Sequence, residues 1–247
     1  MKYLIFVISI LILTACKKAE DRACFKNAGE ATSLTIALPD FDKLKVGGHI
    51  EVVLIQGTEN KAVIHGRKNL IKHIAAEIND QGFLELTNKN KCNFLRSYPK
   101  NKIKVELHFV TLNELRFEGT DDLTCQSTIH TNHFKMVIQD GGATVYLDLD
   151  CTYFEAVQGH GYGNFVAKGS CKNLHAKITS NGYCDISQMQ VENSLVFISS
   201  TPVSSFINLD GSNATVEING SGNVKYIGYP ASLQLNRYGK GDLINFN

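Results

Sequence analysis

A period of about twenty residues runs through the C-terminal half of the chain and constrains its fold more than any other feature. Each period ends on an apolar residue, continues through a turn of small or glycine residues, and then starts a new strand. The residues that end successive periods are Phe117, Ile138, Val157, Ile178, Ile198 and Ile218, separated by 21, 19, 21, 20 and 20 residues. Self-similarity at such a period indicates a solenoid, a propeller or another repeat array.

The length of the period decides between these architectures. A propeller blade needs about 40 residues for its four strands, which is twice the period of this chain. A coil of about twenty residues cannot bury its own apolar side, but parallel coils stacked at about 4.8 Å place equivalent side chains over one another. We therefore predict an all-β protein whose main part is a parallel β-helix.

The strands that begin each period predict the register of the stack. Their alignment forms a column of Leu123, Val145, Phe165, Ile186, Phe206 and Val224. In this register Cys125 is a small core residue, and Cys151 lies directly beneath Cys171. Cα atoms about 4.8 Å apart fall within the range of a disulfide, although parallel strands point their Cβ atoms alongside each other. A Cys151–Cys171 disulfide and two free thiols both remain open.

The segment of residues 32–110 is β-rich without the period. Its short runs of alternating apolar and polar residues end at turn residues, as where His49–Ile55 meets Gln56-Gly57. The chain is 43% hydrophobic, which is the composition of a folded protein. We expect one head domain over residues 32–247, with N-terminal strands at 32–110 and repeat coils at 111–247.

The N-terminus has the features of a secretion signal followed by a lipid-attachment site. Residues 3–13 form an apolar run after Lys2 that is shorter than the roughly 20 residues a bilayer-spanning helix needs. The run ends in Leu13-Thr14-Ala15-Cys16, which resembles the bacterial lipobox. We expect a signal peptide at 1–15, lipidation of Cys16 and a tether at 16–31, because several acyl chains together anchor a protein firmly.

Six cysteines remain beside Cys16, an even number that suits an oxidising envelope. They are Cys24, Cys92, Cys125, Cys151, Cys171 and Cys184. None belongs to a Cys-x-x-Cys pair, so the sequence supports neither a thioredoxin-like redox site nor a zinc ribbon. We expect no metal and no cofactor.

The net charge of +1 lacks the basic excess of a dedicated nucleic-acid binder, so we expect no nucleic-acid partner. The charge is uneven, however, because residues 17–110 hold 16 Lys and Arg against 11 Asp and Glu, whereas residues 111–247 hold 8 against 13. A basic cluster with interleaved aromatic residues is a candidate polyanion contact. Its members are Lys89, Lys91, Arg96, Lys100, Lys102 and Lys104. Ordinary solvated lysines are the alternative.

No catalytic constellation is recognisable, and we expect no catalytic residues. Asp148 and Asp150 form the best acidic pair and would share one face of a strand. Because β-helices also host polysaccharide-processing enzymes, such an enzyme is the first alternative function. A structural envelope protein that stacks into homo-oligomers is the second.

These features together resemble the head GIN domain family, a domain-of-unknown-function family of Gram-negative envelope lipoproteins described as "putative auto-transporter adhesin". The segments that carry the resemblance are Cys24–Lys26, Pro39–Leu44, Ile50–Gly57, Asn69–Ile71, Asn90–Tyr98, Gly220–Val224, Gly228–Pro230 and Gly239–Gly241. The sequence departs from the family pattern in its four later cysteines and in Ser199–Ser205, where the usual glycine turn is missing.

The resemblance implies a right-handed β-helical head and a disulfide between Cys24 and Cys92, with two unrelated thiols as the alternative. It also implies a non-enzymatic adhesin or surface-interaction module, lipid-anchored in the cell envelope at the outer membrane, with a glycan or protein partner. Whether the head faces the periplasm or the cell exterior stays open.

Overall fold

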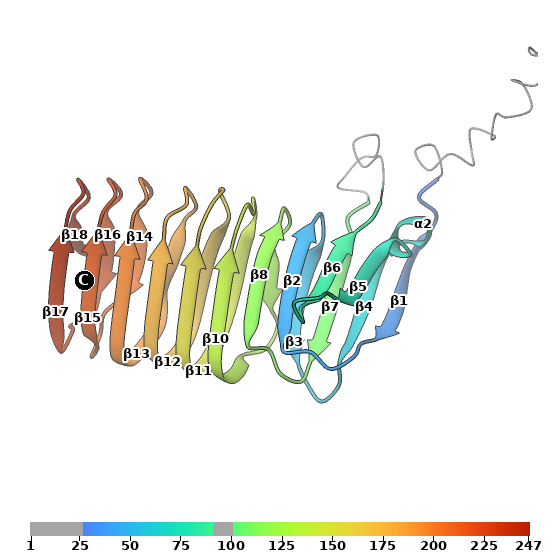
Figure 1. Cartoon of the computed structure of the whole chain (residues 1–247), viewed down its shortest axis with the longest axis horizontal. Helices are drawn as coiled ribbons and strands as arrows, with labels where there is room; N and C mark the ends of the chain where they lie inside the picture. The colour runs from blue at the N-terminus through green and yellow to red at the C-terminus, as the bar shows by residue number, and fades with distance from the viewer. Residues whose placement is uncertain (1–26, 91–100) are drawn as a thin grey trace, which may run out of the picture.

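The computed structural model describes residues 27–90 and 101–247, and it confirms an all-β protein built as a parallel β-solenoid (Figure 1). The N-terminal strands are β1 (Ala31–Ala37), β2 (Lys43–Gly48), β3 (Glu51–Gln56), β4 (Lys61–Arg67), β5 (Ile74–Ile78), β6 (Leu84–Asn88) and β7 (Lys104–Phe109). The short helix α2 (Lys68–Ile71) separates β4 from β5.

Eleven more strands complete the stack. They are β8 (Glu114–Gly119), β9 (Leu123–Cys125), β10 (Ile129–Ile138), β11 (Thr144–Gln158), β12 (Asn164–Ile178), β13 (Cys184–Ser199), β14 (Ser205–Asn208), β15 (Asn213–Ile218), β16 (Val224–Ile227), β17 (Ser232–Arg237) and β18 (Leu243–Asn245). Each coil, called a rung below, contributes one strand to each of two facing sheets, and the sheets enclose the apolar core (Figure 1).

Alternation along the strands produces that core. In β11, for example, Val145, Leu147 and Leu149 are buried while the residues between them face outward. Parallel pairing without offset puts Val145 beside Phe165 and Leu147 beside Ala167. Burial therefore continues from rung to rung, as expected for a solenoid whose coils have no core of their own.

The apolar column that ends the periods differs from the prediction at two positions. Ile138 pairs with Gln158 rather than Val157, and Ile178 pairs with Ser199 rather than Ile198. A shift of one residue exchanges the two faces of a strand, so Gln158 and Ser199 are fully buried. Ile138, Gln158 and Ile178 follow one another at intervals of 20 residues, so Val157 lies one position short of the column. Ser199 enters the column because the β12–β13 pairing is irregular between Cys171 and Asn173. The Gln158 amide nitrogen donates hydrogen bonds to the carbonyls of two successive turns, which satisfies the buried N–H group.

The predicted column of residues at the start of the periods also differs from the structure. Phe165 pairs with Cys184 and Cys184 with Ser205, so the predicted places of Ile186 and Phe206 in this column are wrong. An irregularity in the β12–β13 pairing between Val166 and Lys168 inserts one residue and moves the register. Phe206 lies outside, against the rings of Tyr183 and Phe246.

The order of the first rungs in space differs from their order along the chain. β2 pairs with both β6 and β8, and β3 pairs with both β7 and β9, all in parallel. The rung made of β2 and β3 therefore lies between two rungs that follow it in sequence. β4 and β1 extend one sheet beyond β7 by antiparallel pairing, and β5 extends the other beyond β6.

In the described residues, no helix has the length and apolar character needed to cross a membrane.

Candidate functional site

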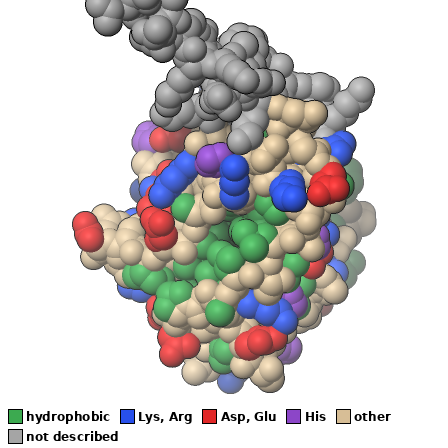
Figure 2. Space-filling model, turned by 90° about the vertical axis from the view of Figure 1, so that its right-hand side faces the viewer, with side chains coloured by type: hydrophobic (Ala, Val, Ile, Leu, Met, Phe, Trp, Pro, Cys, Tyr) green, Lys and Arg blue, Asp and Glu red, His purple; other side chains and the backbone are tan. Residues whose placement is uncertain are grey.

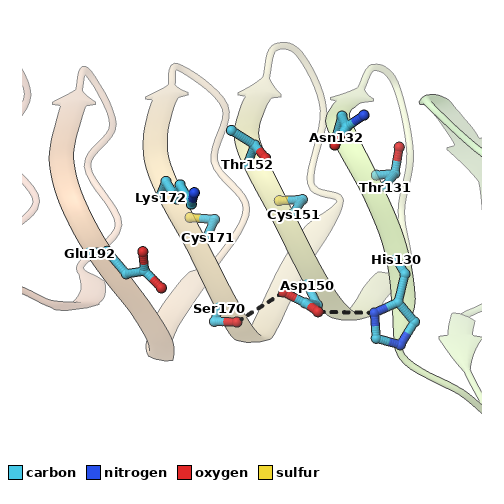
Figure 3. Close-up of a pocket in the computed structure, with 10 residues that line it drawn as sticks. All are labelled: His130, Thr131, Asn132, Asp150, Cys151, Thr152, Ser170, Cys171, Lys172 and Glu192. Carbon is cyan, nitrogen blue, oxygen red and sulfur yellow. Dashed lines mark hydrogen bonds and ion pairs between the residues drawn. The ribbon is translucent and has the colours of Figure 1, made fainter.

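An open groove lies at the bend where the long strands β10–β13 pass from one sheet to the other (Figure 3). Its volume is about 400 Å³. The lining residues come from four successive rungs and are mostly polar: His130, Thr131, Asn132, Asp150, Cys151, Thr152, Ser170, Cys171, Lys172 and Glu192. Because the rungs repeat every twenty residues here, the groove is three stacked columns of side chains.

The outer column forms a hydrogen-bonded ladder across three strands. The Asp150 carboxylate lies 3.0 Å from His130 Nδ1 and accepts a hydrogen bond of 3.3 Å from the Ser170 hydroxyl (Figure 3). His130 and Asp150 are both well exposed, with side-chain exposures of 66% and 58%. The ladder therefore holds polar groups in fixed positions while leaving them open to a ligand.

The order of groups in this ladder does not match a nucleophilic triad. In a Ser-His-Asp triad the imidazole lies between the hydroxyl and the carboxylate, so that it takes the hydroxyl proton. Here Asp150 lies between His130 and Ser170, and the serine hydroxyl has only a carboxylate as its partner. This geometry positions polar groups without activating the hydroxyl.

The middle column contains the two cysteines that the sequence places one above the other. Cys151 and Cys171 are direct partners in the register, as predicted, and both are free thiols. The Cys171 thiol hydrogen-bonds to Cys151, which lowers the pKa of Cys151 and raises that of Cys171. Burial raises the Cys171 pKa further. A disulfide between them stays a prediction.

The remaining described cysteines do not line the groove; Cys184 is buried and Cys125 is partly buried. Burial raises the pKa of Cys125 to about 11, and it raises the pKa of Cys184 well above its usual value. Both are free thiols packed with the core. Their surroundings suit structural residues better than reactive ones.

The acidic pair of the enzyme alternative lies beside the groove on β11. Asp148 pairs with Lys168 at 3.1 Å, while Asp150 belongs to the ladder. Both carboxylates lie on the outer face of the strand, as the sequence predicts. Each already has a cationic or imidazole partner.

The predicted basic cluster is only partly within the described residues. Lys89 pairs with Glu77, Lys102 with Glu51 and Lys104 with Glu106, at 3.4, 2.6 and 3.0 Å. The hydrogen bond from Lys102 to Glu51 raises the pKa of that lysine. In these ion pairs, glutamates neutralise the lysine charges that a polyanion would bind. The polyanion contact stays a prediction. Several predicted site residues lie outside the described residues: Cys16, Cys24, Lys91, Cys92, Arg96 and Lys100.

Within residues 27–90 and 101–247, no three His, Cys, Asp or Glu side chains gather as metal ligands would. Among the groove residues, the sequence points to Asp150 and the two cysteines but gives no direct indication of Ser170, Lys172 or Glu192. A signal for the ladder exists in the sequence, since His130, Asp150 and Ser170 are exactly one period apart. The bend of the strands, which turns these columns into a groove, has no such signal.

The comparison with protein families matches residues 40–230 to the family described as "Putative auto-transporter adhesin, head GIN domain". No curated protein matches the sequence.

Several solved structures share the fold. A "putative adhesin" from Bacteroides fragilis is 19% identical with a TM-score of 0.73, covering 88% of this chain and 97% of the other. A "putative adhesin" from Parabacteroides distasonis has 18% identity, a TM-score of 0.62, and coverages of 88% and 98%. A "putative lipid binding protein" from the same species has 18% identity, a TM-score of 0.59, and coverages of 89% and 98%.

Proposed function

The chain belongs to the head GIN domain family, and we propose that it is a membrane-tethered, non-enzymatic adhesin whose corner groove binds a glycan. The observation that carries this proposal is the groove itself, which runs across four rungs and presents a hydrogen-bonding side chain from every one of them.

The chemistry of the groove favours a hydroxyl-rich, weakly charged ligand. Asp150 and Glu192 accept hydrogen bonds, Lys172 donates them, and the amide of Asn132 does both. Opposite charges stand side by side, so a strongly anionic polymer would meet carboxylates as well as cations. Sugar hydroxyls donate and accept at once, which matches such a mixed surface.

Aromatic rings border the groove and add an apolar contact. His133 and Tyr153 follow the groove residues Asn132 and Thr152 on the same strands, and their rings pack edge to face with centroids 5.1 Å apart. Aromatic side chains with a polar tip suit ligands that are apolar on one side and wet on the other. A pyranose ring has this character.

Tethering rests on the lipobox-like Leu13–Cys16, which leaves a short segment between Cys16 and the head. An anchored adhesin must hold its ligand-binding surface away from the lipid. The groove is formed by β10–β13, in the middle of the stack and several rungs from the end where the N-terminal segment enters (Figure 1).

The non-enzymatic part of the proposal rests on two geometric points. The groove is open rather than a closed cleft that excludes water, and the serine of its ladder is paired with a carboxylate rather than with an imidazole. The enzyme alternative would need Asp148 or Asp150 as an acid or a base, although both carboxylates have partners.

A glycan array tests the proposal with the full chain purified in detergent. Asp150→Asn removes the carboxylate at the centre of the ladder, and Asp148→Asn is the matched control on the same face of the same strand. We expect the wild type and Asp148→Asn to bind the same glycans, and Asp150→Asn to lose at least about tenfold in affinity, a typical cost for a charged hydrogen-bonding group.

Three outcomes would contradict the proposal. Equal binding by the two variants would place the ligand elsewhere, and absence of binding to glycans and to intact bacterial surfaces would remove the adhesin function. Conversion of a bound polysaccharide into shorter products, lost on Asp148→Asn or Asp150→Asn, would establish the enzyme instead.

A further inference from the structure

We infer that the N-terminal end of the solenoid is a membrane-contact surface that seats the head on the lipid bilayer to which Cys16 tethers it. The inference rests on the proposed lipid anchor. It concerns the end formed by β1, β5 and α2, far from the groove (Figure 1).

Within residues 27–90 and 101–247, no further rung covers the core of the solenoid at this end. Among the described strands, β1 pairs only with β4 and β5 pairs only with β6, so each is the last strand of its sheet. Leu34 stands beside buried Ile64, and Ile78 stands beside buried Leu84. The core-facing side of both sheets therefore continues onto the last strands with no rung beyond them.

The result is an exposed apolar patch. Leu34 is 40% exposed and Ile78 is 42% exposed, whereas their partners on the inner strands are almost completely buried. Ile36, Leu38 and Ala76 pack against the core beside them and are partly buried. Figure 2 looks onto this end and shows apolar side chains gathered at its centre, with charged side chains around them. Exposed apolar patches with a polar rim mark interaction surfaces.

Basic residues lie at the border of the patch on and around α2. Leu70 and Ile71 bury the inner side of this helix, while Lys68 and Lys72 are exposed. Lys68 lies 3.6 Å from Glu30, and both side chains are largely exposed, so the pair is weak. Lysine beside exposed leucine and isoleucine is the combination that binds the interface of a bilayer with anionic lipids.

The point where the chain enters the head favours the bilayer, rather than a protein partner, as the surface that the apolar patch contacts. The carbonyls of Ala28 and Glu30 accept hydrogen bonds of 3.0 Å from the backbone of Asn69 and Lys68. These bonds fix the start of the described chain on α2, beside the patch. Cys16 precedes Asn27 by 11 residues, which at about 3.5 Å per residue span at most about 40 Å. A lipidated Cys16 therefore keeps this end of the head close to the bilayer.

Tryptophan fluorescence tests the contact, because the chain has no Trp of its own. Leu34→Trp and Ile78→Trp place reporters on the two sheets at the proposed contact. Leu235→Trp is the matched control, since Leu235 is also a strand leucine with 45% exposure but lies at the opposite end of the stack. The full lipidated chain is reconstituted into vesicles of phosphatidylcholine and phosphatidylglycerol whose acyl chains carry bromine, which quenches nearby Trp.

We expect the emission of the two N-terminal reporters to shift to shorter wavelength and to lose most of its intensity. The Leu235→Trp emission should stay unchanged. Two reporters on different strands keep the test valid if one variant fails to fold. Quenching of Leu235→Trp equal to that of the other two would overturn the inference, as would a complete lack of quenching in protein that floats with the vesicles.

Flotation separates the failure of this inference from the failure of the tether. Protein that floats without quenching is anchored but does not dock, whereas protein that does not float has no functional anchor, and the inference then fails with it. A blue shift that appears in detergent without vesicles and grows with protein concentration would assign the patch to a second copy of the chain and overturn the membrane contact.

Discussion

Arg237 lies directly above Ile218 in the last rung of the solenoid, and its guanidinium pairs with Asp242 at 2.6 Å. In earlier rungs the corresponding position holds residues buried in the core, such as Ile178 and Ser199. A charge at an inward position opposes the addition of another rung, which is a common protection of sheet edges. The C-terminal end therefore differs from the N-terminal end, where the last strands carry Leu34 and Ile78 inward.

Replacing this charge should promote self-association. Arg237→Leu would extend the apolar row of Leu233 and Leu235 on β17, which are already 41% and 45% exposed. We expect dimers or larger species to appear in light scattering at concentrations where the wild type has a lower mass. Lys177→Leu, on the outer face of a central strand, is the control and should leave the mass unchanged. An equal increase in mass for both variants would indicate non-specific hydrophobic association rather than pairing at the edge strand β17.

The proposed lipid anchor depends on one cysteine, Cys16. Cys16→Ser removes the thiol that takes up diacylglycerol, so metabolic labelling with a palmitate analogue should vanish and the protein should leave the detergent phase on phase separation. Cys125→Ser keeps Cys16 and should retain the label. Label that persists in Cys16→Ser would mean that the lipid is attached elsewhere or that the lipobox prediction is wrong.

The groove cysteines should differ in reactivity once the protein is reduced. The hydrogen bond from Cys171 lowers the pKa of Cys151, so its reactive thiolate forms at a lower pH than that of an ordinary cysteine. We expect iodoacetamide to modify Cys151 before Cys171, with a rate that rises with pH. Cys171→Ala removes the donor and should move the rate profile of Cys151 to higher pH. Peptide mass spectrometry gives both rates, and an unchanged profile would contradict the thiol pairing.

Alkaline pH should destabilise the fold through Cys125. Burial raises the pKa of this thiol from 9.0 to about 11, so the folded state holds the proton more tightly than the unfolded state does. The stabilisation is complete below pH 9, falls as pH rises towards 11, and amounts to about 2–3 kcal/mol. Urea unfolding under reducing conditions should show this loss between pH 9 and 11. Cys125→Ala should flatten that part of the profile, and a profile equal to that of the wild type would exclude Cys125 as its cause.

One glycine permits the close approach of two rungs. Gly169 has a φ of +110°, and a Cβ built on it would lie 2.0 Å from the carbonyl oxygen of Leu149 in the rung before. Gly169→Ala should therefore lower the free energy of unfolding by about 3 kcal/mol or more. Gly142→Ala is the control, because nothing lies within 4 Å of its Cβ. Similar midpoints for the two variants in urea would contradict the packing at Gly169.

Periodicity predicted the architecture because a twenty-residue coil has few ways to bury its apolar side. It also predicted the pairing of Cys151 with Cys171, since the turn between these two strands has the average length. It did not predict that Gln158 and Ser199 face inward, because their apolar neighbours Val157 and Ile198 suggested an alignment one residue off, and a shift of one residue exchanges the faces of a strand. The buried Gln158 is held by turn carbonyls that come together only in the folded stack.

Less of the candidate site than of the fold could be predicted from the sequence. The sequence indicates Asp150 as a possible acid of an enzyme. Its partners His130 and Ser170, however, lie twenty residues before it and twenty residues after it. Their alignment required the register, and their exposure required the bend in β10–β13. The apolar patch was not predicted either, because the alternation in β1 is the same as in a strand that is covered on both edges.

The position of β2 and β3 between later rungs determines when the N-terminal part of the stack can form. Both neighbours of β2, which are β6 and β8, are made after it. As the chain is made, β2 and β3 can therefore pair on one side only after β6 and β7 have followed, and on the other side only after the chain up to Cys125 is complete. Formation of this end of the stack therefore requires contacts between strands far apart in the sequence, whereas the C-terminal rungs pair in the order in which they are made.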